Sequence, residues 1–506
     1  MENLVTIDAD EYRAAFSSLN KAFDEGRTRP YEWRIHQIRQ VLKMIKENEE
    51  VLMEAQKLDL GRGKSEARLL ELPVVESEIK YMIKNLKKWM YPVRVGTPLL
   101  LAISRSEYTY EPLGVALIIG PFNYPIVLTL WPLLGALSAG NCVLIKPSEF
   151  SPHIASLLQT LIPKYLDNKC IKVINGDANI TSKLLDLPWN KILFTGSARV
   201  GKIVAAAAAK HLTPVTLELG GKCPCIIDEY CGDLKTAARR VIWGRMTNCG
   251  QTCVAPDYIL CHSKHYEEFV RLLVDTVQEF YGPDSQLSND LSRIVSTAHC
   301  DRLQALLDDS GGKIWCGGIV DREKKYVAPT VMTDMRPDSR ILSEEIFGPI
   351  LPVMKITDIS EAIRYVKKKE KPLSLSLFTT NKLNINKVRK TIQTGSIIIN
   401  DSLFQIANVE LPFNGVGQSG LGCYRGKFSY EAFSQRMSYL HKDMTPLLDL
   451  PVRYPPFTPF KQSVVLFVMN CMSVPVLPNF GEIFRYFTVA FLGAGITIMI
   501  MNLKKK

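Results

Sequence analysis

The sequence predicts an α/β protein whose strands form parallel, doubly wound sheets, and three observations support this prediction. The chain has 506 residues, which is too long for one hydrophobic core and predicts two or three domains. From about residue 108 onward, short and continuously apolar runs alternate with segments of helical periodicity, as in parallel sheets covered by helices. The composition, 46% hydrophobic and 22% charged, is that of a folded globular protein rather than a disordered one.

The order of the elements follows from the periodicity. The first ninety or so residues predict helices, because apolar residues recur at three- and four-residue spacing through YEWRIHQIRQVLKMIKENEEVLMEAQKLDLG. Strands are then expected at GVALIIG, CVLIKP, CIKVING and KILFTG. The helix-like segments among them are WPLLGALSAG, SPHIASLLQTLIPKYL, DANITSKLLDL and VGKIVAAAAAKH. A second alternating region, from VTLELGG to SIIIN, predicts a second α/β domain.

Charge and cysteine usage narrow the class of protein. The net charge is +11, but the basic residues are dispersed and accompany no zinc finger or RNA-binding aromatic motif, so a nucleic-acid partner is not expected. The twelve cysteines are too dilute for a disulfide scaffold, and the N-terminal MENLVTIDADEYRAAF has no apolar core of a signal peptide. Reduced thiols in a cytosol-facing compartment are therefore expected. The CPC at 223–225 lacks zinc-ligand spacing, so no metal site is expected.

The C-terminus carries an uncharged apolar run, Tyr486–Asn502, followed by LKKK. Counted to Leu503 it has 18 residues, or roughly 27 Å of helix, close to the hydrocarbon thickness of a bilayer. The run predicts a transmembrane anchor at 486–503, because a terminal segment has no later element to cover it as a core helix. The apolar run 463–477 is shorter and contains Pro475, so it predicts a membrane-surface or domain-capping helix.

Two glycine- and charge-bearing turns follow predicted strands. FTGSARVG, 194–201, ends one strand and opens a helix, and free N–H groups at a helix N-terminus suit a pyrophosphate. LIKPSE places Lys146 and Glu149 where the carboxyl ends of parallel strands form a ligand crevice. Taken singly, the first stretch fits a plain strand-to-helix turn as well, and the second fits a solvated loop.

Three residues are candidates for chemistry. Glu218 of VTLELGGK is a carboxylate in an apolar strand, where burial would raise its pKa and suit it to general-base work. Cys253 of GQTCVAPDY lies among small groups that permit substrate access. Asn123 of PFNYP has a side-chain amide that could donate to an oxyanion. For each of the three, an ordinary turn or strand-end role is the alternative.

These stretches occur together in a recognisable order. GPFNYP, LIKPSE, FTGSARVG, LELGGK, GQTCVAPDY and EEIFGPILP resemble the aldehyde dehydrogenase superfamily in order and approximate spacing. PFNYP, CVAPDY and FSYEAFSQR resemble its class 3, membrane-anchored fatty aldehyde dehydrogenase branch, and the resemblance covers about residues 10–440. Six ordered motifs are far more specific than any one of them.

The resemblance implies NAD(P)-dependent oxidation of medium- to long-chain fatty aldehydes to carboxylic acids. Cys253 would be the nucleophile, and the Asn123 side chain with the Cys253 backbone N–H would hold the oxyanion of a thiohemiacetal. After the hydride transfer, Glu218 would activate water to hydrolyse the thioester. Tyr124 would line an apolar substrate channel.

The resemblance also implies a set of cofactor-binding residues. Lys146 and Glu149 would contact the adenosine ribose, Glu345 would hold the nicotinamide ribose and Phe347 would pack near it. The carboxylate of Glu149 favours NAD, with NADP as an alternative. The turn implied to bind the pyrophosphate comprises Gly196, Ser197, Ala198, Arg199, Val200 and Gly201.

The implied organisation is a Rossmann-type cofactor domain, an α/β catalytic domain, a small bridging element and the membrane helix. The expected boundaries are 1–94 with 113–216 for NAD binding, 217–394 for catalysis, 95–112 with 395–430 for bridging, 431–485 for an extension and 486–503 for the anchor. A homodimer is expected through the bridging element. The catalytic part would face the cytosol from the endoplasmic reticulum or the mitochondrial outer membrane.

Two positions depart from the family pattern. Asn414 of LPFNGVG replaces a usual glycine, which asparagine does at low cost if the backbone has positive φ. Cys249 precedes Cys253 by four residues and is either an inert buried thiol or a partner for Cys253 under oxidation. Two alternative functions stay open. In the first, the acyl group is transferred to coenzyme A instead of water, and the presence of Glu218 argues against it. In the second, the chain is a membrane-tethered NAD-binding protein without catalysis, and the intact Cys253, Glu218 and Asn123 argue against it.

Overall fold

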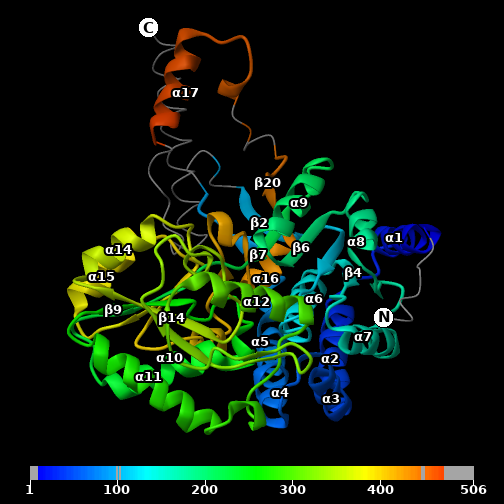
Figure 1. Ribbon diagram of the computed structural model, residues 1–506. Helices are drawn as coiled ribbons and strands as arrows, with labels where there is room; N and C mark the ends of the chain where they lie inside the picture. Colours follow the sequence, from blue (N-terminus) through cyan, green and yellow to red (C-terminus); the bar gives the residue numbers. More distant parts are fainter. Residues whose placement is uncertain (1–8, 98–100, 102–103, 446–448, 450, 472–506) are drawn as a thin grey trace. The chain divides into compact units, whose positions relative to one another are not determined.

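The structure is a computed structural model that describes residues 9–97, 101, 104–445, 449 and 451–471 (Figure 1). The chain forms two compact units. One comprises Met1–Leu86 and Pro112–Ser434, and the other comprises Lys87–Glu111 and Gln435–Lys506. The first unit contains two large sheets and every candidate site residue.

The first sheet has six strands in the order β18-β7-β6-β3-β4-β5. Five strands are parallel, and β18 joins the edge antiparallel to β7. All residues of β3 and β4 are buried, which explains their uninterrupted apolar sequences. The chain runs outward from β3 in both directions, so a ligand crevice is expected at the carboxyl ends beside β3. The strands are β3 (Val115–Ile119), β4 (Cys142–Lys146), β5 (Ile171–Val173), β6 (Lys191–Gly196), β7 (Val215–Leu219) and β18 (Gly420–Leu421).

Helices surround this sheet. Every residue of α6 is buried, so α6 is a core helix rather than an amphipathic surface helix. Asp177 and Ser197 cap the N-termini of α8 and α9 with their side chains. The helices are α1 (Ala9–Asp24), α2 (Tyr31–Glu47), α3 (Glu49–Leu60), α4 (Lys64–Leu70), α5 (Leu72–Trp89), α6 (Val127–Ala139), α7 (Pro152–Tyr165), α8 (Ala178–Leu185), α9 (Ala198–Ala209) and α16 (Gly426–Ala432).

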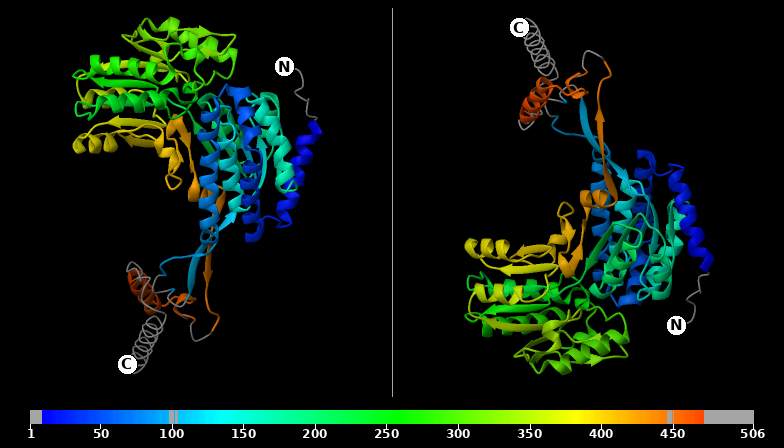
Figure 2. Two further views of the ribbon diagram at one scale, coloured as in Figure 1. Left: turned by 90° about the horizontal axis from the view of Figure 1, so that it is seen from below. Right: turned by 90° about the horizontal axis from the view of Figure 1, so that it is seen from above.

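The second sheet has seven strands in the order β10-β13-β14-β9-β8-β15-β16. All neighbours are parallel except the edge strand β10, which pairs antiparallel with β13. Figure 2 shows this block in green and yellow beside the blue and cyan elements of the first. The strands are β8 (Pro224–Ile227), β9 (Tyr258–His262), β10 (Lys313–Cys316), β13 (Thr330–Thr333), β14 (Ile350–Ile356), β15 (Ser374–Phe378) and β16 (Ser396–Ile399).

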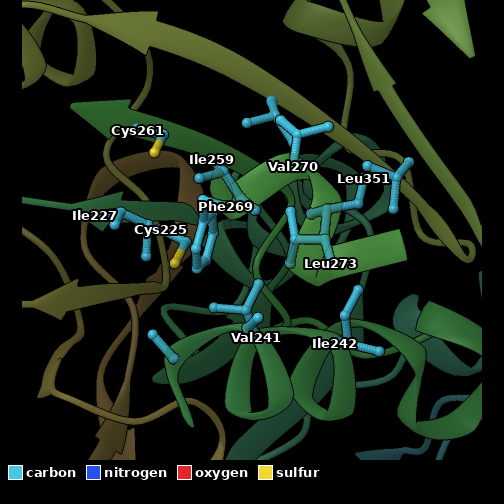
Figure 3. Close-up of a cluster of buried hydrophobic side chains, with 14 of the residues drawn as sticks. Cys225, Ile227, Val241, Ile242, Ile259, Cys261, Phe269, Val270, Leu273 and Leu351 are labelled. Atoms are coloured by element: carbon cyan, nitrogen blue, oxygen red, sulfur yellow. The ribbon is translucent and has the colours of Figure 1, made fainter. Parts of the chain in front are cut away.

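Both faces of the second sheet are covered. Ile259 and Cys261 of β9 pack with Phe269 and Leu273 of α11 on one face (Figure 3). Leu260, between them in the sequence, packs on the other face against α14 and α15. This alternation is the two-residue period of a strand buried on both sides. The helices are α10 (Leu234–Met246), α11 (Tyr266–Tyr281), α12 (Thr297–Ser310), α13 (Arg340–Ser343), α14 (Ile359–Lys367) and α15 (Lys382–Thr391).

Short elements complete the first unit. They connect the sheets or line the site described below. They are η2 (Thr247–Gly250), η3 (Ser285–Leu287), β11 (Val320–Asp321), β12 (Tyr326–Val327), η4 (Phe404–Ala407), β17 (Phe413–Asn414), η5 (Gly417–Ser419) and β19 (Cys423–Tyr424).

The second unit contains a three-stranded sheet in the order β1-β2-β20, whose strands come from both chain segments of that unit. β20 lies at its edge, and all of its residues after the first are exposed. A helix, α17, follows further along the chain. The elements are β1 (Val93–Arg94), β2 (Arg105–Pro112), β20 (Ser434–His441), η7 (Pro451–Arg453) and α17 (Pro459–Cys471).

The predicted fold class is confirmed for the two parallel α/β sheets. The predicted anchor, 486–503, lies outside the described residues, as does the end of the apolar run 463–477, whose beginning lies in α17. Within the described part of the chain, no helix has both the length and the apolar character to cross a bilayer. The expected domain boundaries stay a prediction. Of the expected bridging segment 395–430, β16 belongs to the second sheet and β18 to the first.

Candidate active site

An apolar cavity of about 200 Å³ lies in the first unit, and Cys253 is part of its wall. Residues from α4, α5, α6, α10 and η4 surround it, so elements of both sheet blocks contribute. Three of its large hydrophobic residues, Leu69, Trp243 and Phe404, are also exposed to solvent. The cavity is lined by Leu69, Leu70, Val74, Tyr124, Val127, Leu128, Trp131, Trp243, Thr247, Thr252, Cys253, Val254, Leu403, Phe404, Ile406, Ala407 and Phe413.

A left-handed turn presents Cys253. Asn248 and Cys249 have φ values of 55° and 53°, and Gly250 follows at 73°. Only glycine fits the third position, because a Cβ there would collide with the Gly348 carbonyl. Burial, and secondarily the nearby carboxyls of Glu345 and Glu218, raises the pKa of the Cys253 thiol to about 12. The thiol is therefore neutral at physiological pH in the protein without ligand.

Asn123 follows β3 and faces the same turn. Its side-chain nitrogen donates to the Gln251 carbonyl at 2.9 Å, which uses one of its two protons. Its own backbone carbonyl accepts from the Asn248 amide at 2.9 Å. Asn123 is 3% exposed, so these bonds hold the amide in a fixed orientation. The second amide proton is available to an oxyanion.

Glu218 is buried in β7, and neither carboxyl oxygen has a hydrogen-bond partner among the residues that the structure describes. Burial raises the pKa of Glu218 well above its usual value, because a buried carboxylate loses its hydration. The charge of the Glu218 carboxyl also contributes to the raised pKa of the Cys253 thiol. An unsatisfied buried carboxyl beside a thiol is typical of a functional rather than a structural group.

Tyr124 lines the cavity, and its role in a substrate channel stays a prediction. Its hydroxyl shares a hydrogen bond of 2.6 Å with the hydroxyl of Thr252, next to Cys253. The guanidinium of Arg62 lies 5.0 Å from the centre of its ring. The Tyr124 side chain therefore separates the cavity from a buried polar layer around Arg62.

The turn 196–201 lies at the carboxyl end of β6 and at the start of α9. Ser197 and Arg199 are exposed, and the Ser197 hydroxyl accepts from the Val200 N–H at 3.4 Å. Gly201 packs against Leu219, where a side chain would not fit. The first N–H groups of α9 thus stand open at the edge of the sheet, as an anion site requires.

Lys146 and Glu149 pair with each other, with Lys146 Nζ 2.5 Å from Glu149 Oε2. Lys146 ends β4 and is 2% exposed, whereas Glu149 is half-buried. The carboxyl end of β4 lies beside that of β3, so the pair stands at the expected crevice.

Glu345 and Phe347 lie in a loop that several groups hold. Glu345 accepts from the Gly221 N–H at 3.0 Å, and any Cβ at Gly220 would collide with its carboxyl group. Burial, and secondarily the charge of Asp257, raises the pKa of Glu345 to about 7. Phe347 has a φ of 51° and packs edge-to-face on Phe122, with ring centres 5.8 Å apart.

The same loop is anchored through its backbone. Arg302 donates to the carbonyls of Glu345 and Ile346, and Lys222 donates to the carbonyl of Glu344 at 2.9 Å. The open α9 N-terminus, the close glycine approach at Gly220 and this anchored loop fit a dinucleotide cofactor. Within the described residues, no group of three His, Cys, Asp or Glu side chains is placed to hold a metal ion.

The two departures have different outcomes. Asn414 lies in the short strand β17, paired with Cys423, and its φ is not positive, so the low-cost argument for asparagine does not apply to it. Cys249 is fully buried among Leu291, Leu303 and neighbours, whereas Cys253 packs against a different apolar cluster. Both are free thiols, and their pairing under oxidation stays a prediction.

Sequence reasoning missed three residues at the site. Arg62 and Asn248 hydrogen-bond across 186 positions of sequence, and nothing local signals that contact. Tyr424 is fully buried, and its hydroxyl has no hydrogen-bond partner within the described part of the chain. Burial raises the pKa of Tyr424, as do the nearby Glu218 and Cys253. A tyrosine after the Gly-rich GQSGLGC was the available signal.

Comparison with known proteins identifies the family. The sequence model of the aldehyde dehydrogenase family matches residues 2–438. The chain belongs to the aldehyde dehydrogenase family. Family 3 member B2 of Mus musculus is 43% identical over 466 residues, 92% of this chain and 96% of the relative. Family 3 member A2 of Rattus norvegicus is 42% identical over 445 residues, 88% of this chain and 91% of the relative.

Solved structures agree with this family. The substrate-bound state of Staphylococcus aureus AldH has 40% identity and a TM-score of 0.87, over 90% of this chain and 99% of that one. Indole-3-acetaldehyde dehydrogenase in complex with NAD⁺ has 25% identity and a TM-score of 0.80, over 86% of this chain and 89% of that one. This aldehyde dehydrogenase is therefore an NAD(P)-dependent aldehyde oxidoreductase, as the motifs predicted.

Proposed function

We propose that this aldehyde dehydrogenase oxidises medium- to long-chain fatty aldehydes to carboxylic acids through a covalent intermediate on Cys253. The observation that carries the proposal is the apolar cavity whose wall includes Cys253. Its lining is almost entirely hydrocarbon, and its exposed members Leu69, Trp243 and Phe404 extend that lining to solvent. A polar or very short aldehyde would leave this surface in contact with water, whereas an alkyl chain would cover it.

The first half of the reaction forms a bond between Cys253 Sγ and the aldehyde carbon. The negative charge that develops on the aldehyde oxygen is stabilised by the free Asn123 amide proton and the Cys253 backbone N–H. Because the thiol pKa lies at about 12, only a small fraction of Cys253 is thiolate at neutral pH, and this fraction, which has already released its proton to solvent, is the form that attacks. When bound, NAD(P) would supply the acceptor for the hydride that leaves the former aldehyde carbon, and loss of that hydride turns the thiohemiacetal on Cys253 into a thioester.

The second half releases the acid from the Cys253 thioester. Glu218 in its ionised form takes a proton from water as the water attacks the thioester carbon, and the thiol leaves. The burial that raises its pKa makes Glu218 a stronger base once it is ionised. Thioester formation followed by hydrolysis splits one difficult step into two easier ones.

The cofactor would be held by three groups of residues. The turn Gly196–Gly201 at the start of α9 would take the pyrophosphate, and Lys146 with Glu149 would take the adenosine ribose. Glu345 and Phe347 would hold the nicotinamide end. We propose NAD as the preferred cofactor, since the carboxylate of Glu149 would repel a 2′-phosphate.

We further propose that residues 486–503 anchor the protein in a membrane, with the catalytic part facing the cytosol at the endoplasmic reticulum or the mitochondrial outer membrane. Long alkyl aldehydes partition into lipid, so an anchored enzyme meets them at high local concentration. A homodimer is supported by β20, a strand at the edge of its sheet whose residues after the first are exposed, so that a second copy could add a strand there.

A steady-state assay of aldehyde-dependent NADH formation tests the covalent role. Cys253→Ala is expected to lower kcat by at least about 1,000-fold, because Cys253 is the one thiol among the described residues that line the cavity. Cys231→Ala is the matched control, since Cys231 is also half-buried but lies outside the cavity. Full activity of Cys253→Ala would contradict the proposal. If acyl-CoA formed when coenzyme A was added, coenzyme A rather than water would be the acceptor of the acyl group.

A further inference from the structure

Arg62 lies in the loop between α3 and α4, and it is 1% exposed. Its guanidinium donates through three nitrogens. Nε donates to Asn248 Oδ1 at 3.0 Å, and Nη2 donates to the Asn123 carbonyl at 2.6 Å. Nη1 donates to Gln56 Oε1 at 2.5 Å and forms an ion pair with Glu71.

The two partners Asn123 and Asn248 belong to the two segments that form the reaction centre. Asn123 carries the proposed oxyanion donor, and Asn248 begins the left-handed turn that leads to Cys253. The Asn248 amide donates to the carbonyls of both Asn123 and Gln251, at 2.9 and 3.1 Å. Arg62 therefore fixes the orientation of an amide that itself joins the two segments.

The ion-pair partner reinforces this arrangement. Glu71 accepts from the N–H groups of Ile126 and Val127, both at 2.8 Å, at the start of α6. The segment that contains Asn123 is thus held at its own carbonyl by Arg62 and three residues later by Glu71. On the other segment, Glu66 accepts from the Asn248 N–H at 2.6 Å.

We infer that Arg62 is a positioning residue for the oxidation, which holds the donor Asn123 and the turn before Cys253 in register with each other. The inference rests on the proposed roles of Asn123 and Cys253. Arginine suits this task because its planar fork serves several acceptors in fixed directions, whereas a lysine ammonium is a point charge on a flexible stem. Arg62 does not itself line the cavity, so its effect on substrate must pass through these partners or through Tyr124, whose ring centre lies 5.0 Å from the guanidinium.

The test compares the Arg62→Lys variant with the wild type, both as full-length proteins. We expect kcat for decanal oxidation to fall about 100-fold, because a displacement of about 1 Å between nucleophile and donor costs that much. The KM for NAD is expected to stay within about threefold, since none of the residues proposed to hold the cofactor is a hydrogen-bond or ion-pair partner of Arg62. Alkylation of Cys253 by iodoacetamide is expected to stay within about twofold, because that reaction uses no oxyanion donor.

Two further variants separate positioning from folding. Arg62→Met combined with Glu71→Gln removes the buried ion pair together and leaves no isolated charge. This double variant should show the same fall in kcat as Arg62→Lys, with the KM for NAD unchanged. Arg34→Lys is the control, since Arg34 is another buried arginine, which donates to the carbonyls of Thr28 and Ser138 and lies outside the site. It should keep kcat within about twofold.

The outcomes decide the inference. A kcat within about threefold of wild type in folded Arg62→Lys would overturn it, and so would equal losses of kcat, alkylation rate and NAD affinity. Failure of both Arg62 variants to fold would assign the residue to stability and overturn it as well. Activity of Cys253→Ala in the same assay would instead mark failure of the proposed function.

Discussion

Replacing an apolar residue of the cavity wall by a carboxylate should shift the enzyme's preference toward aldehydes with shorter alkyl chains. Leu69 lines the cavity and is 66% exposed, so Leu69→Asp changes the lining without emptying the core. Each methylene of substrate that leaves water contributes about 0.8 kcal/mol. A leucine side chain covers about two methylenes, so the variant should lose about 1.6 kcal/mol, or about 15-fold in kcat/KM, for aldehydes long enough to reach it.

The assay is kcat/KM for unbranched aldehydes of increasing length at saturating NAD. In the wild type, kcat/KM should rise about fourfold per added methylene until the chain fills the cavity. In Leu69→Asp the short aldehydes should be unaffected and the rise should stop early. Leu383→Asp is the control, because Leu383 is 77% exposed on α15 and lies outside the cavity. Equal loss at every chain length would refute the reasoning.

Three further predictions concern other parts of the chain. Glu218→Gln should form a first equivalent of NADH at the normal rate and then turn over about 100-fold more slowly. In the wild type, the rate of thioester hydrolysis should rise with pH as Glu218 ionises. Rapid-quench kinetics measures both rates. The pKa of Glu345 is about 7, above its usual 4.5, so the folded state binds the extra proton and loses stability as pH rises from about 4.5 to 7. Glu345→Gln should therefore raise the thermal midpoint of unfolding at pH 8 but not at pH 4. Glu344→Gln is the control and should not raise the midpoint at pH 8, because a hydrogen bond from Arg340 lowers the pKa of Glu344. Equal midpoints for Glu345→Gln and wild type at pH 8 would contradict the prediction. Removal of residues 486–506 should move the protein from the membrane to the soluble fraction, and persistence on membranes would assign binding to α17 or to the basic surface.

Much of the architecture could be predicted because each strand carries its own signal. GVALIIG and CVLIKP read as buried parallel strands, and β3 and β4 are wholly buried. The candidate residues Cys253, Asn123 and Glu218 stood out because a reactive or polar group in an apolar or turn context has few structural uses. Their ordered motifs then pointed to one family.

The rest depended on contacts that no local pattern records. Arg62 reaches Asn248 across 186 positions and Asn123 across 61, so only the folded chain brings the three together. The left-handed backbone at Asn248 and Cys249 is likewise imposed from outside, by Glu66 and by the packing of Gly250 on Gly348. Asn414 was considered for the same kind of backbone, but strand pairing with Cys423 places it in extended conformation.

The most direct test of the covalent mechanism is to trap the intermediate. Glu218→Gln is mixed with NAD and decanal, quenched in acid and digested, and the peptides are measured by mass spectrometry. The mechanism predicts one decanoyl group on the peptide that contains Cys253, and none when Cys253→Ala is added to the variant. An absence of adduct during a full burst of NADH, or an adduct on another cysteine such as Cys249, would contradict it.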